Sequence, residues 1–257
     1  MTLSDPEIER YSRQLVLPEW SGEAQERLRS ASAIVVGAGA LGSPAALYLV
    51  AAGVGTVGVV DDGTVELSNL HRQPLHFTPD LDLPKVTTAA IKLRVLNPEV
   101  QVEEYQVRLE EANADAIVAG AGVVLDCTDN FDTRYLLNDT CCAQGVPLVS
   151  GAVLGFAGQV MTIVPGRSAC YRCAFATPPP AGAVPSCREA GVLGATAGIV
   201  GSIQALEALK LLTGIGSPLL DRILQLDALS MEQTLVATER GADCPACARV
   251  PAAAQSV

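Results

Sequence analysis

The sequence predicts an α/β protein with one sheet that is parallel in its N-terminal half, continues as antiparallel strands, and carries helices on both faces. Up to residue 145, short aliphatic runs alternate with helical segments, which is the pattern of a parallel sheet. After residue 146 the apolar runs come in pairs joined by turns, which favours hairpins. A length of 257 residues suits a single domain over 1–257, with a change of topology near residue 150.

The elements of the first half follow from short patterns. Residues 5–30 are expected to form an amphipathic helical lead-in. Four apolar runs are expected to be strands: 33–36, 56–61, 100–107 and 122–127. Helices are expected after the glycine-rich loop at 37–42, over 85–98 and over 131–145; Asn97-Pro98 ends the second and Gly145 the third.

The second half predicts a hairpin from the runs "PLVSGAV" and "GQVMTIVP", then a Pro/Gly-rich loop over 176–186. A long helix is expected over 194–213, with one lysine at the edge of its apolar face. That face is expected to contain Ile199, Ile203, Leu206, Leu209 and, at its edge, Lys210. The runs "RILQLDAL" and "QTLVAT" predict a final antiparallel pair.

Composition excludes some classes of function. The net charge of −11 argues against nucleic acid as the main partner, because phosphate binding needs a dense positive surface. The N-terminus lacks the cationic start and apolar run of a signal peptide. The two longest uncharged stretches, 30–60 and 140–166, are broken by Gly and Pro, so we expect core segments and no membrane partner. A cytoplasmic location is the resulting expectation.

The glycine-rich loop "GAGALG" indicates a nucleotide site on a Rossmann-like sheet. It lies between a strand and a helix, where glycines let the backbone approach a ligand and the helix N-terminus offers amides. Gly39, Ala40 and Gly42 are therefore candidate binding positions. Asp61 follows Gly42 by 19 residues at the end of the second strand, which suits a carboxylate that binds ribose hydroxyls. The motif alone does not fix the reaction type, and a purely structural turn is the alternative.

Asn69, Arg72 and Lys85 follow Asp61 closely and favour phosphates over hydride transfer. Arg72 and Lys85 can neutralise phosphate oxygens, and Asn69 can hydrogen-bond the phosphates or the sugar. The chain has two histidines, both in this one loop, so no separate acid–base group for a dehydrogenase is evident. A solvated loop is the alternative interpretation, but three such groups together favour triphosphate binding.

The segment "DCTDN" places Asp129 and Asn130 just after a buried strand, at the sheet edge where α/β proteins bind ligands. An acid there can hold Mg²⁺ against phosphates, so Asp129 is the candidate magnesium ligand and Asn130 a candidate nucleotide contact. Asp129 could equally cap the helix that begins near Phe131. Asp126 lies nearer the strand and is expected to be structural.

Two CxxC pairs, "CYRC" and "CPAC", are the strongest local signal. Cys170, Cys173, Cys244 and Cys247 can supply four thiolates to a tetrahedral Zn²⁺. No position is left for water, so the zinc should be structural and should join the C-terminal tail to the middle of the fold. Disulfides are the alternative, which a reducing compartment disfavours. Three other cysteines are expected to be buried and to act as small hydrophobic side chains: Cys127, Cys141 and Cys142.

One further cysteine, Cys187, ends the Pro/Gly-rich loop beside Arg188, which would favour its thiolate. A reactive thiol and an inert loop cysteine are both consistent with these residues. With the zinc ligands assigned, the expected domain consists of a nucleotide-binding half over 5–150 and an antiparallel, zinc-bearing half over 151–248.

The order of these motifs resembles the MoeB/ThiF/HesA adenylyltransferases, the bacterial relatives of ubiquitin-activating enzymes. The resemblance rests on "RYSRQ", "GAGALGS", "DDGTVELSNLHRQ", "PKV", "DCTDN", "CYRC", "SCREAGV" and "CPAC", and covers residues 5 to 248. Ala40 stands where many relatives carry glycine, a change that leaves a backbone contact possible. No rhodanese-like extension follows Ala248, so a separate sulfur donor is expected.

The resemblance implies an enzyme that binds Mg-ATP and the Gly-Gly tail of a ubiquitin-like sulfur carrier of the ThiS or MoaD kind. The tail carboxylate would attack the α-phosphate, giving an acyl-adenylate that later becomes a thiocarboxylate. By position, the ribose acid falls on Asp61, the phosphate groups on Asn69, Arg72 and Lys85, and the magnesium acid on Asp129. Arg13 matches an arginine that reaches the partner protomer's ATP, which implies a homodimer. Cys187 matches a cysteine that some members use covalently and others do not need.

The residues fit this chemistry. A C-terminal carboxylate, with a reference pKa of about 3.3–3.7, is ionised at pH 7 and needs no general base. Two alternatives remain: an NAD-dependent oxidoreductase with a Rossmann-like domain, and a non-catalytic member of the fold. The intact set of Arg13, Arg72, Lys85 and Asp129 argues against the second. The sequence leaves open which carrier and pathway the protein serves.

Overall fold

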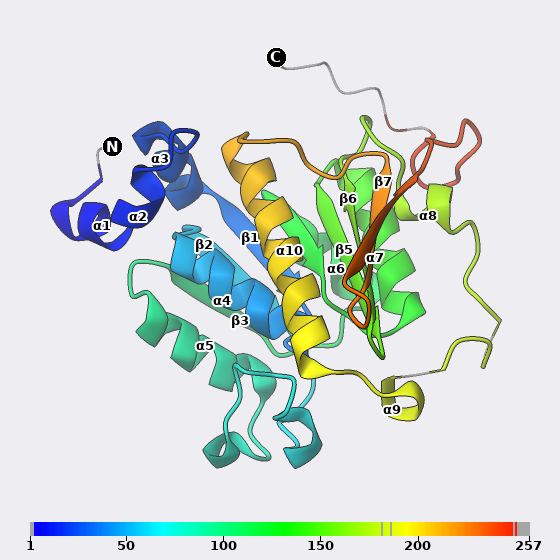
Figure 1. Ribbon diagram of the computed structural model, residues 1–257, viewed down its shortest axis with the longest axis horizontal. Coiled ribbons are helices and arrows are strands. Elements are labelled where there is room, and N and C mark those ends of the chain that lie inside the picture. Colours follow the sequence, from blue (N-terminus) through cyan, green and yellow to red (C-terminus); the bar gives the residue numbers. More distant parts are fainter. Residues whose placement is uncertain (1–2, 181, 186, 249, 251–257) are drawn as a thin grey trace.

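The computed structural model describes residues 3–180, 182–185, 187–248 and 250, with only the backbone of Cys187 and Arg188. Its centre is one eight-stranded sheet in the order β3-β2-β1-β4-β5-β6-β7-β8 (Figure 1). The strands are β1 (Ser32–Val36), β2 (Thr56–Val60), β3 (Gln101–Tyr105), β4 (Val123–Asp126), β5 (Leu148–Leu154), β6 (Ala157–Ile163), β7 (Arg222–Asp227) and β8 (Glu232–Ala237).

Helices cover both faces of this sheet. The α-helices are α1 (Asp5–Arg10), α2 (Ser12–Leu15), α3 (Gly22–Ser30), α4 (Gly42–Ala52), α5 (Lys85–Leu96), α6 (Glu111–Val118), α7 (Phe131–Gln144), α8 (Tyr171–Ala174), α9 (Cys187–Ala190) and α10 (Gly194–Thr213). Two 3-10 turns, η1 (Leu67–Asn69) and η2 (Thr78–Asp80), lie in the long connection between β2 and α5. Figure 1 shows α4, α5 and α10 on one face, and α6 and α7 on the other.

The first five strands are parallel, as the aliphatic runs predicted. β1 pairs with β2 on one side and with β4 on the other, so the chain turns in opposite directions from these two central strands. In open α/β sheets, ligands bind at such a switch point, beyond the carboxyl ends of the strands. The glycine loop after β1 and the "CTDN" segment after β4 therefore meet at one edge of the sheet.

The sheet then changes direction without a break. β5 pairs parallel with β4 through Val124↔Leu148 and antiparallel with β6 through Leu148↔Ile163. β6, β7 and β8 continue as antiparallel strands, and all six residues of β8 are exposed. The predicted fold class, a parallel half continued by antiparallel strands, is confirmed.

Two apolar clusters fill the space between the sheet and its helices. One lies under α4, α5 and α10 and includes Leu49, Leu93 and Val200. The other lies under α6 and α7 and includes Leu137 and three cysteines of the predicted zinc site, Cys170, Cys244 and Cys247. Glycines in the left-handed conformation end three of the helices: Gly53 after α4, Gly145 after α7 and Gly214 after α10.

The lead-in over residues 5–30 is helical, as predicted, but two local features were not predicted. The N-terminal lead-in is three short helices, because the chain leaves the helix at Tyr11, whose buried hydroxyl accepts a hydrogen bond from Asn97 at 2.8 Å. Helix α6 was not expected at all. Its sequence, "EANADAIV", has few large apolar residues, and only Ala114, Ile117 and Val118 are buried.

Helix α10 was predicted in its bounds but not in its orientation. Ile199 and Leu206, assigned to the buried stripe, are 36% and 55% exposed. The buried face instead uses small residues, because the helix lies so close to α4 that a Cβ on Gly201 would be 2.3 Å from the Leu41 carbonyl oxygen. Among the described residues α10 is also the one helix long and apolar enough to span a membrane; core helices pass the same test, and α10 packs on β5, β6 and α4.

Candidate functional site

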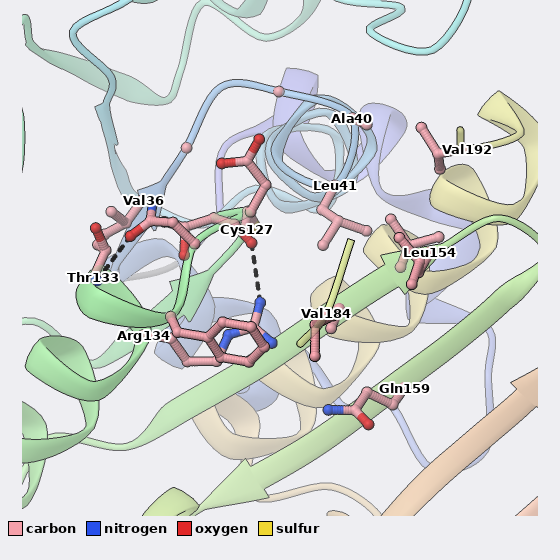
Figure 2. A pocket seen from close by; sticks show the side chains of 18 of the residues that line it. Val36, Ala40, Leu41, Cys127, Thr133, Arg134, Leu154, Gln159, Val184 and Val192 are labelled. Carbon is pink, nitrogen blue, oxygen red and sulfur yellow. Dashed lines mark hydrogen bonds between the residues drawn. The ribbon is translucent and has the colours of Figure 1, made fainter. Parts of the chain in front are cut away.

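A cleft of about 1450 Å³ opens along the carboxyl edge of the parallel strands and continues over the antiparallel ones. Figure 2 shows it between the glycine-loop residues Ala40 and Leu41 and, opposite them, Arg134 and Gln159. Seven of the residues predicted to bind nucleotide line it: Gly39, Ala40, Asp61, Arg72, Lys85, Asp129 and Asn130. Three other predicted site residues, Arg13, Gly42 and Asn69, are not part of its lining.

The glycine loop is shaped by two close backbone contacts. Gly37 has φ +98°, and a Cβ there would be 2.7 Å from the carbonyl oxygen of Cys127 at the end of β4. A Cβ on Gly42 would be 1.7 Å from the Gly37 carbonyl oxygen. Gly42 thus lets α4 begin tightly against the loop and does not itself face the cleft, whereas Gly39 and Ala40 do.

The Asp61 carboxylate holds the glycine loop by accepting a hydrogen bond from its backbone. Its Oδ2 accepts a hydrogen bond from the Ala38 amide at 2.8 Å, and its Oδ1 accepts one from the Gly63 amide at 2.8 Å. Each carboxylate oxygen keeps a second lone pair, so the group can still accept hydrogen bonds from ribose hydroxyls. A Cβ on Gly63 would lie 3.0 Å from Asp61 Oδ1 and 3.4 Å from Lys85 Nζ, so the carboxylate and the amine flank the same point of the cleft wall.

Lys85 is the first residue of α5. A cation at a helix N-terminus opposes the helix dipole, so its position is unfavourable for the helix and suits the binding of an anion. Arg72 is half-buried and lines the cleft; one of its guanidinium nitrogens donates to the Ser68 carbonyl at 2.7 Å, and the same nitrogen lies 2.9 Å from His71 Nε2. Two cations therefore face the cleft beyond the ribose position.

Asn69 has a local role in the structure. It is 6% exposed, and its Oδ1 accepts a hydrogen bond from the Glu66 amide at 3.2 Å, which closes the 3-10 turn η1. The turn in turn positions the segment that carries Arg72. The predicted contact between Asn69 and a nucleotide stays a prediction.

Asp129 does not cap α7. The N-cap is Asn130, whose side chain accepts a hydrogen bond from the Thr133 amide at 2.9 Å. Asp129 is exposed at the cleft wall, with no hydrogen bond or ion pair to any described residue. The carboxylate is therefore available to a ligand, and the helix-cap alternative for Asp129 is wrong.

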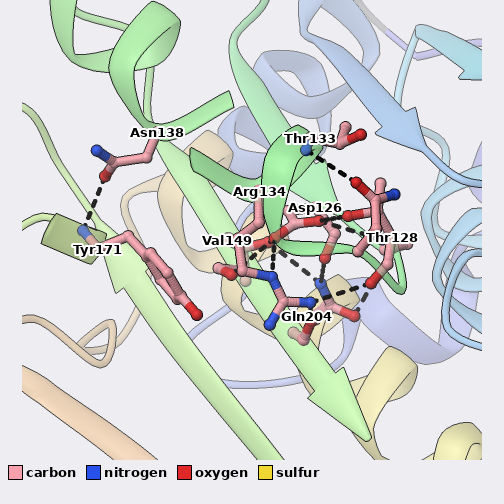
Figure 3. A network of polar contacts seen from close by, with 12 residues as sticks. Asp126, Thr128, Thr133, Arg134, Asn138, Val149, Tyr171 and Gln204 are labelled. Atoms are coloured by element: carbon pink, nitrogen blue, oxygen red, sulfur yellow. Dashed lines mark hydrogen bonds and ion pairs between the residues drawn. The ribbon is translucent and has the colours of Figure 1, made fainter. Parts of the chain in front are cut away.

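A buried ion pair lies beneath this segment. Arg134 Nε is 3.0 Å from Asp126 Oδ2, and the side chains are 6% and 0% exposed. Arg134 also donates to the carbonyl oxygens of Thr128 at 3.0 Å and Gly151 at 2.8 Å, while Asp126 accepts hydrogen bonds from Ser150 and Thr128 (Figure 3). Asp126 is structural, as predicted. Arg134 was missed, because its sequence context does not reveal that it spans the ends of β4 and β5.

The far part of the cleft lies over β5, β6 and β7 and is bordered by residues of 175–180 and 182–185. It is lined by Leu154, Gln159, Gln225 and Asp227 from the strands and by the three prolines at 178–180 from the loop. This half is an extended groove with few charges of its own beyond Asp227, Glu189 and Glu232. Cys187 opens helix α9 next to this groove, but its side chain lies outside the described residues.

The four predicted zinc cysteines come together on the α7 face of the sheet. All four Sγ atoms lie within 4.8 Å of one another, and three of the pairs are 3.4 to 3.7 Å apart. Zn–S bonds of about 2.3 Å would place tetrahedral sulfurs about 3.8 Å apart, so this donor set fits one zinc ion. The sulfurs are too far apart for disulfides, which require about 2.05 Å.

The surroundings of the cluster act unequally on its four thiols. Burial raises the pKa of Cys173 and Cys247, and a hydrogen bond with Cys142 together with burial raises that of Cys170, so Cys244 is the thiol of the cluster whose pKa is lowered. Burial raises the pKa of the Cys244 thiol, but the amides of Cys247 and Ala246 outweigh it and lower this pKa to about 7. The Gly241 amide donates to Cys173 Sγ at 3.3 Å. The other cysteines predicted as small hydrophobes, Cys127, Cys141 and Cys142, are all buried.

Arg13 is exposed on α2, far from the cleft of its own chain. Helix α3 leads directly into the amino end of β1, so the N-terminal helices lie at the edge of the sheet opposite the cleft (Figure 1). No described residue hydrogen-bonds or pairs with its guanidinium.

Gln73 is a cleft residue that the sequence did not predict. It is 4% exposed, and its Oε1 has no partner among the described groups.

Residues 11–246 match the model of the ThiF family. The chain is 50% identical to a sulfur carrier protein adenylyltransferase of Thermus thermophilus, over 98% of this chain and 94% of that protein. It is 48% identical to a SAMP-activating enzyme E1 of Haloferax volcanii, over 96% of this chain and 91% of that protein.

A longer relative is the adenylyltransferase and sulfurtransferase MOCS3 of Arabidopsis thaliana, which is 45% identical; the chain spans 53% of its length. Among solved structures, the E. coli MccB structure with ATP superposes with a TM-score of 0.84 over 93% of this chain and 75% of that one. At 19% identity this likeness concerns the fold alone.

Proposed function

The chain belongs to the ThiF family, and we propose that it uses ATP to adenylate the C-terminal carboxylate of a small ubiquitin-like sulfur carrier protein. The proposal rests mainly on a single observation: one cleft joins an anion-binding end, with Arg72, Lys85 and Asp129, to a long groove over the antiparallel strands. The names of the two relatives that the chain matches almost end to end support the same activity. That the two halves share one sheet and one cleft supports a single adenylation domain over 1–257.

The reaction joins two anions. A carboxylate oxygen of the carrier's last residue attacks the α-phosphorus of ATP, the bond from that phosphorus to the oxygen that bridges to the β-phosphate breaks, and pyrophosphate leaves. The carboxylate is already ionised at neutral pH, so no proton has to be removed. The protein must hold the two anions in line and stabilise the charge that develops on pyrophosphate.

The residues of the cleft can divide this work. Asp61 can accept hydrogen bonds from the ribose hydroxyls while it fixes the glycine loop. Arg72 and Lys85 can bind phosphate oxygens and balance their charge in the transition state. The backbone at Gly39 and Ala40 can approach the nucleotide closely, and Asn130 and Gln73 offer amide groups at the same wall.

Asp129 fits a magnesium ligand, because its carboxylate is exposed to the cleft and has no partner in the described part of the chain. When bound with ATP, Mg²⁺ would neutralise phosphate charge and polarise the leaving group. Magnesium usually takes one or two protein carboxylates together with substrate oxygens, which agrees with a single acid here.

The groove over β5, β6 and β7 suits an extended peptide without bulky side chains. Its open mouth lies beside the exposed edge strand β8, and residues of 175–180 and 182–185 line part of it. A tail that ends in two glycines could lie in this groove and bring its carboxylate towards Arg72 and Lys85. Zinc would act structurally, because the four thiolates leave no position for water.

We propose a homodimer that completes the site. Arg13 lies at the opposite edge of the sheet from its own cleft, so it can serve a nucleotide only in another subunit. Large apolar side chains face outward nearby on α4, α5 and α10; Tyr48, Val95 and Leu206 are 58%, 80% and 55% exposed. Such a concentration of exposed apolar residues is typical of a subunit interface.

Two further assignments complete the proposal. The sulfur donor is a separate protein, in agreement with the first relative, whose name carries adenylyltransferase activity alone. The reaction takes place in the cytoplasm, where the four cysteines stay reduced and able to bind metal.

Carrier-dependent exchange of radioactive pyrophosphate into ATP tests the activity. The purified protein, with each candidate carrier in turn, is expected to catalyse exchange with one carrier and not without it. Exchange with none, together with tight NAD(H) binding, would restore the oxidoreductase alternative. Nucleotide binding without exchange for any carrier would favour the non-catalytic alternative.

A further inference from the structure

His76 is a buried histidine that the proposed reaction does not use. It is 2% exposed and lies in the connection between η1 and η2, behind the wall of the cleft. Its ring joins two elements that are distant in sequence. Nε2 is 2.9 Å from the carbonyl oxygen of Ala38 in the glycine loop, and Nδ1 is 2.8 Å from Oγ1 of Thr88 in the first turn of α5.

The chemistry of these partners fixes the proton positions. A carbonyl oxygen can only accept, so Nε2 carries the hydrogen and donates it to Ala38. Burial lowers the pKa of His76, and the nearby Lys85 and Lys92 lower it further, so the ring is neutral. The bare Nδ1 therefore accepts the single hydroxyl proton of Thr88 at 2.8 Å, in preference to the more distant Lys85 carbonyl oxygen at 3.1 Å. Both ring nitrogens are satisfied inside the protein, with none left for substrate chemistry.

The peptide of Ala38 is held from two sides. Its carbonyl oxygen accepts from His76, and its amide donates to Asp61 Oδ2 at 2.8 Å. This residue immediately precedes Gly39 and Ala40, whose backbone lines the cleft. Rotation of the chain at Ala38 would break at least one of these bonds, so they fix the direction of the backbone that approaches the nucleotide.

The His76 side chain also sets the distance between the glycine loop and Lys85. Thr88 follows Lys85 by three residues on α5, and the Lys85 amide donates to the Gly63 carbonyl at 3.0 Å, two residues beyond Asp61. Hydrogen bonds thus join Asp61 to Ala38, Ala38 to His76 and His76 to Thr88. Thr88 and Lys85 share the first turn of α5, and Gly63 connects the Lys85 amide back to the Asp61 carboxylate.

We propose that His76 is a positioning residue for nucleotide binding. It holds the glycine loop and the first turn of α5 at one separation, so that the loop backbone and the Lys85 amine reach the same ATP molecule. The inference rests on the proposed function, because ATP is the ligand whose binding it explains. Preorganisation of this kind strengthens binding without direct contact to the ligand.

Four single variants test the role. His76→Phe keeps a ring and loses both hydrogen bonds. His76→Gln keeps an amide donor within reach of the Ala38 oxygen. Thr88→Val removes the hydroxyl, and Thr87→Val is the matched control, since Thr87 neighbours Thr88 on α5 and neither nitrogen of the His76 ring is bonded to it. Mg-ATP dissociation constants are measured by calorimetry, well below the melting temperature of each variant and without any carrier.

The expected result is a rise of about tenfold in the ATP dissociation constant for His76→Phe, a smaller rise for Thr88→Val, and values near wild type for His76→Gln and Thr87→Val. Hydrogen exchange should quicken at the amides of residues 38–42 in His76→Phe, but not in β5. Zinc content, a readout of the rest of the fold, should stay unchanged.

Wild-type affinity for ATP in His76→Phe would overturn the inference. An equal loss of ATP affinity in His76→Gln would also overturn it, and so would faster hydrogen exchange over the whole sheet in His76→Phe. Either result would mean that His76 only supports the core. A wild-type protein that binds no ATP would instead remove the proposed function, which separates the two failures.

Discussion

The Arg134 guanidinium lies 3.0 Å from the Asp126 carboxylate, and the two side chains are 6% and 0% exposed. This pair stands at the switch point of the sheet, where Arg134 also holds the carbonyl oxygens of Thr128 and Gly151. It thereby fixes the start of the segment that ends in Asp129. The ion pair supports the cleft from below, whereas Asp129 and Arg72 line it. Mutations of the ion pair and mutations of the lining residues should therefore have different effects.

Arg134→Met should destabilise the fold strongly. The substitution leaves Asp126 buried without its cation, which costs about 3 to 5 kcal/mol. Urea denaturation should show this loss in the free energy of unfolding. Arg94→Met, which breaks a partly exposed pair with Glu104, should cost at most about 1 kcal/mol. Equal effects of the two substitutions would contradict the structural role of Asp126.

Arg72→Ala and Asp129→Ala should each leave the fold intact and reduce carrier-dependent ATP–pyrophosphate exchange by about 100-fold or more, because each removes a group that stabilises transferring phosphate charge. Circular dichroism and zinc content check the fold. Glu23→Ala, an exposed acid on α3, serves as the control and should exchange normally. Near wild-type exchange in both cleft variants would end the assignment of these roles.

Protein purified under reducing conditions without chelator should contain about one equivalent of zinc per chain. Cys244→Ser should lose it, because three thiolates and a hydroxyl form a much weaker site. Cys141→Ala should retain it, since Cys141 is buried outside the cluster of four. Atomic emission analysis measures the metal, and zinc-free wild-type protein would refute the site.

Arg13 should act in trans. Arg13→Ala and Asp129→Ala are each expected to be inactive as pure proteins. After subunit exchange, half of the dimers are mixed, and each mixed dimer has one cleft with both wild-type groups, so about a quarter of wild-type exchange activity should return. If the mixture stays inactive although mass spectrometry detects mixed dimers, Arg13 does not serve the partner's cleft.

Cys187 should be tested for a covalent role by intact-mass spectrometry of enzyme treated with ATP, carrier and sulfur donor. A thiol-linked carrier adduct that is missing in Cys187→Ala would support a reactive thiol. Full sulfur transfer by Cys187→Ala would show that the cysteine is dispensable, which is the alternative that its sequence leaves open.

Much of the parallel sheet could be predicted, because its strands are short aliphatic runs that differ from their surroundings. The central strand was expected at 33–36 and spans Ser32–Val36. Helix α10 shows the limit of such patterns. Ile199 and Leu206 of its predicted apolar face are exposed, and Ile203 and Leu209 are only partly buried against the core. The fully buried positions are mostly small residues together with Gln204 and Glu207. Only the distance to α4 decides this orientation, and the sequence does not contain that distance.

The residues of the candidate site also divide into those that the sequence predicts and those that it does not. Asp61, Lys85 and Asp129 could be located because each stands at the end of a strand or the start of a helix near the glycine loop. Arg134 and His76 could not, since their roles depend on backbone carbonyl oxygens that approach them only in the folded chain. Residues that carry the chemistry were thus easier to identify than those that hold them in place.

The cysteine cluster also sets an order of events during synthesis. Cys170 and Cys244 are 74 residues apart, so a nascent chain exposes its first dithiol long before the second emerges from the ribosome. A zinc ion that closed a ring of this size would restrict the unfolded chain by about 4 kcal/mol, and that gain would come only once Cys244 and Cys247 are available. A zinc ion held by all four thiolates would therefore be captured only by chains that extend through Cys247, and products that stop before residue 244 should be cleared by proteolysis.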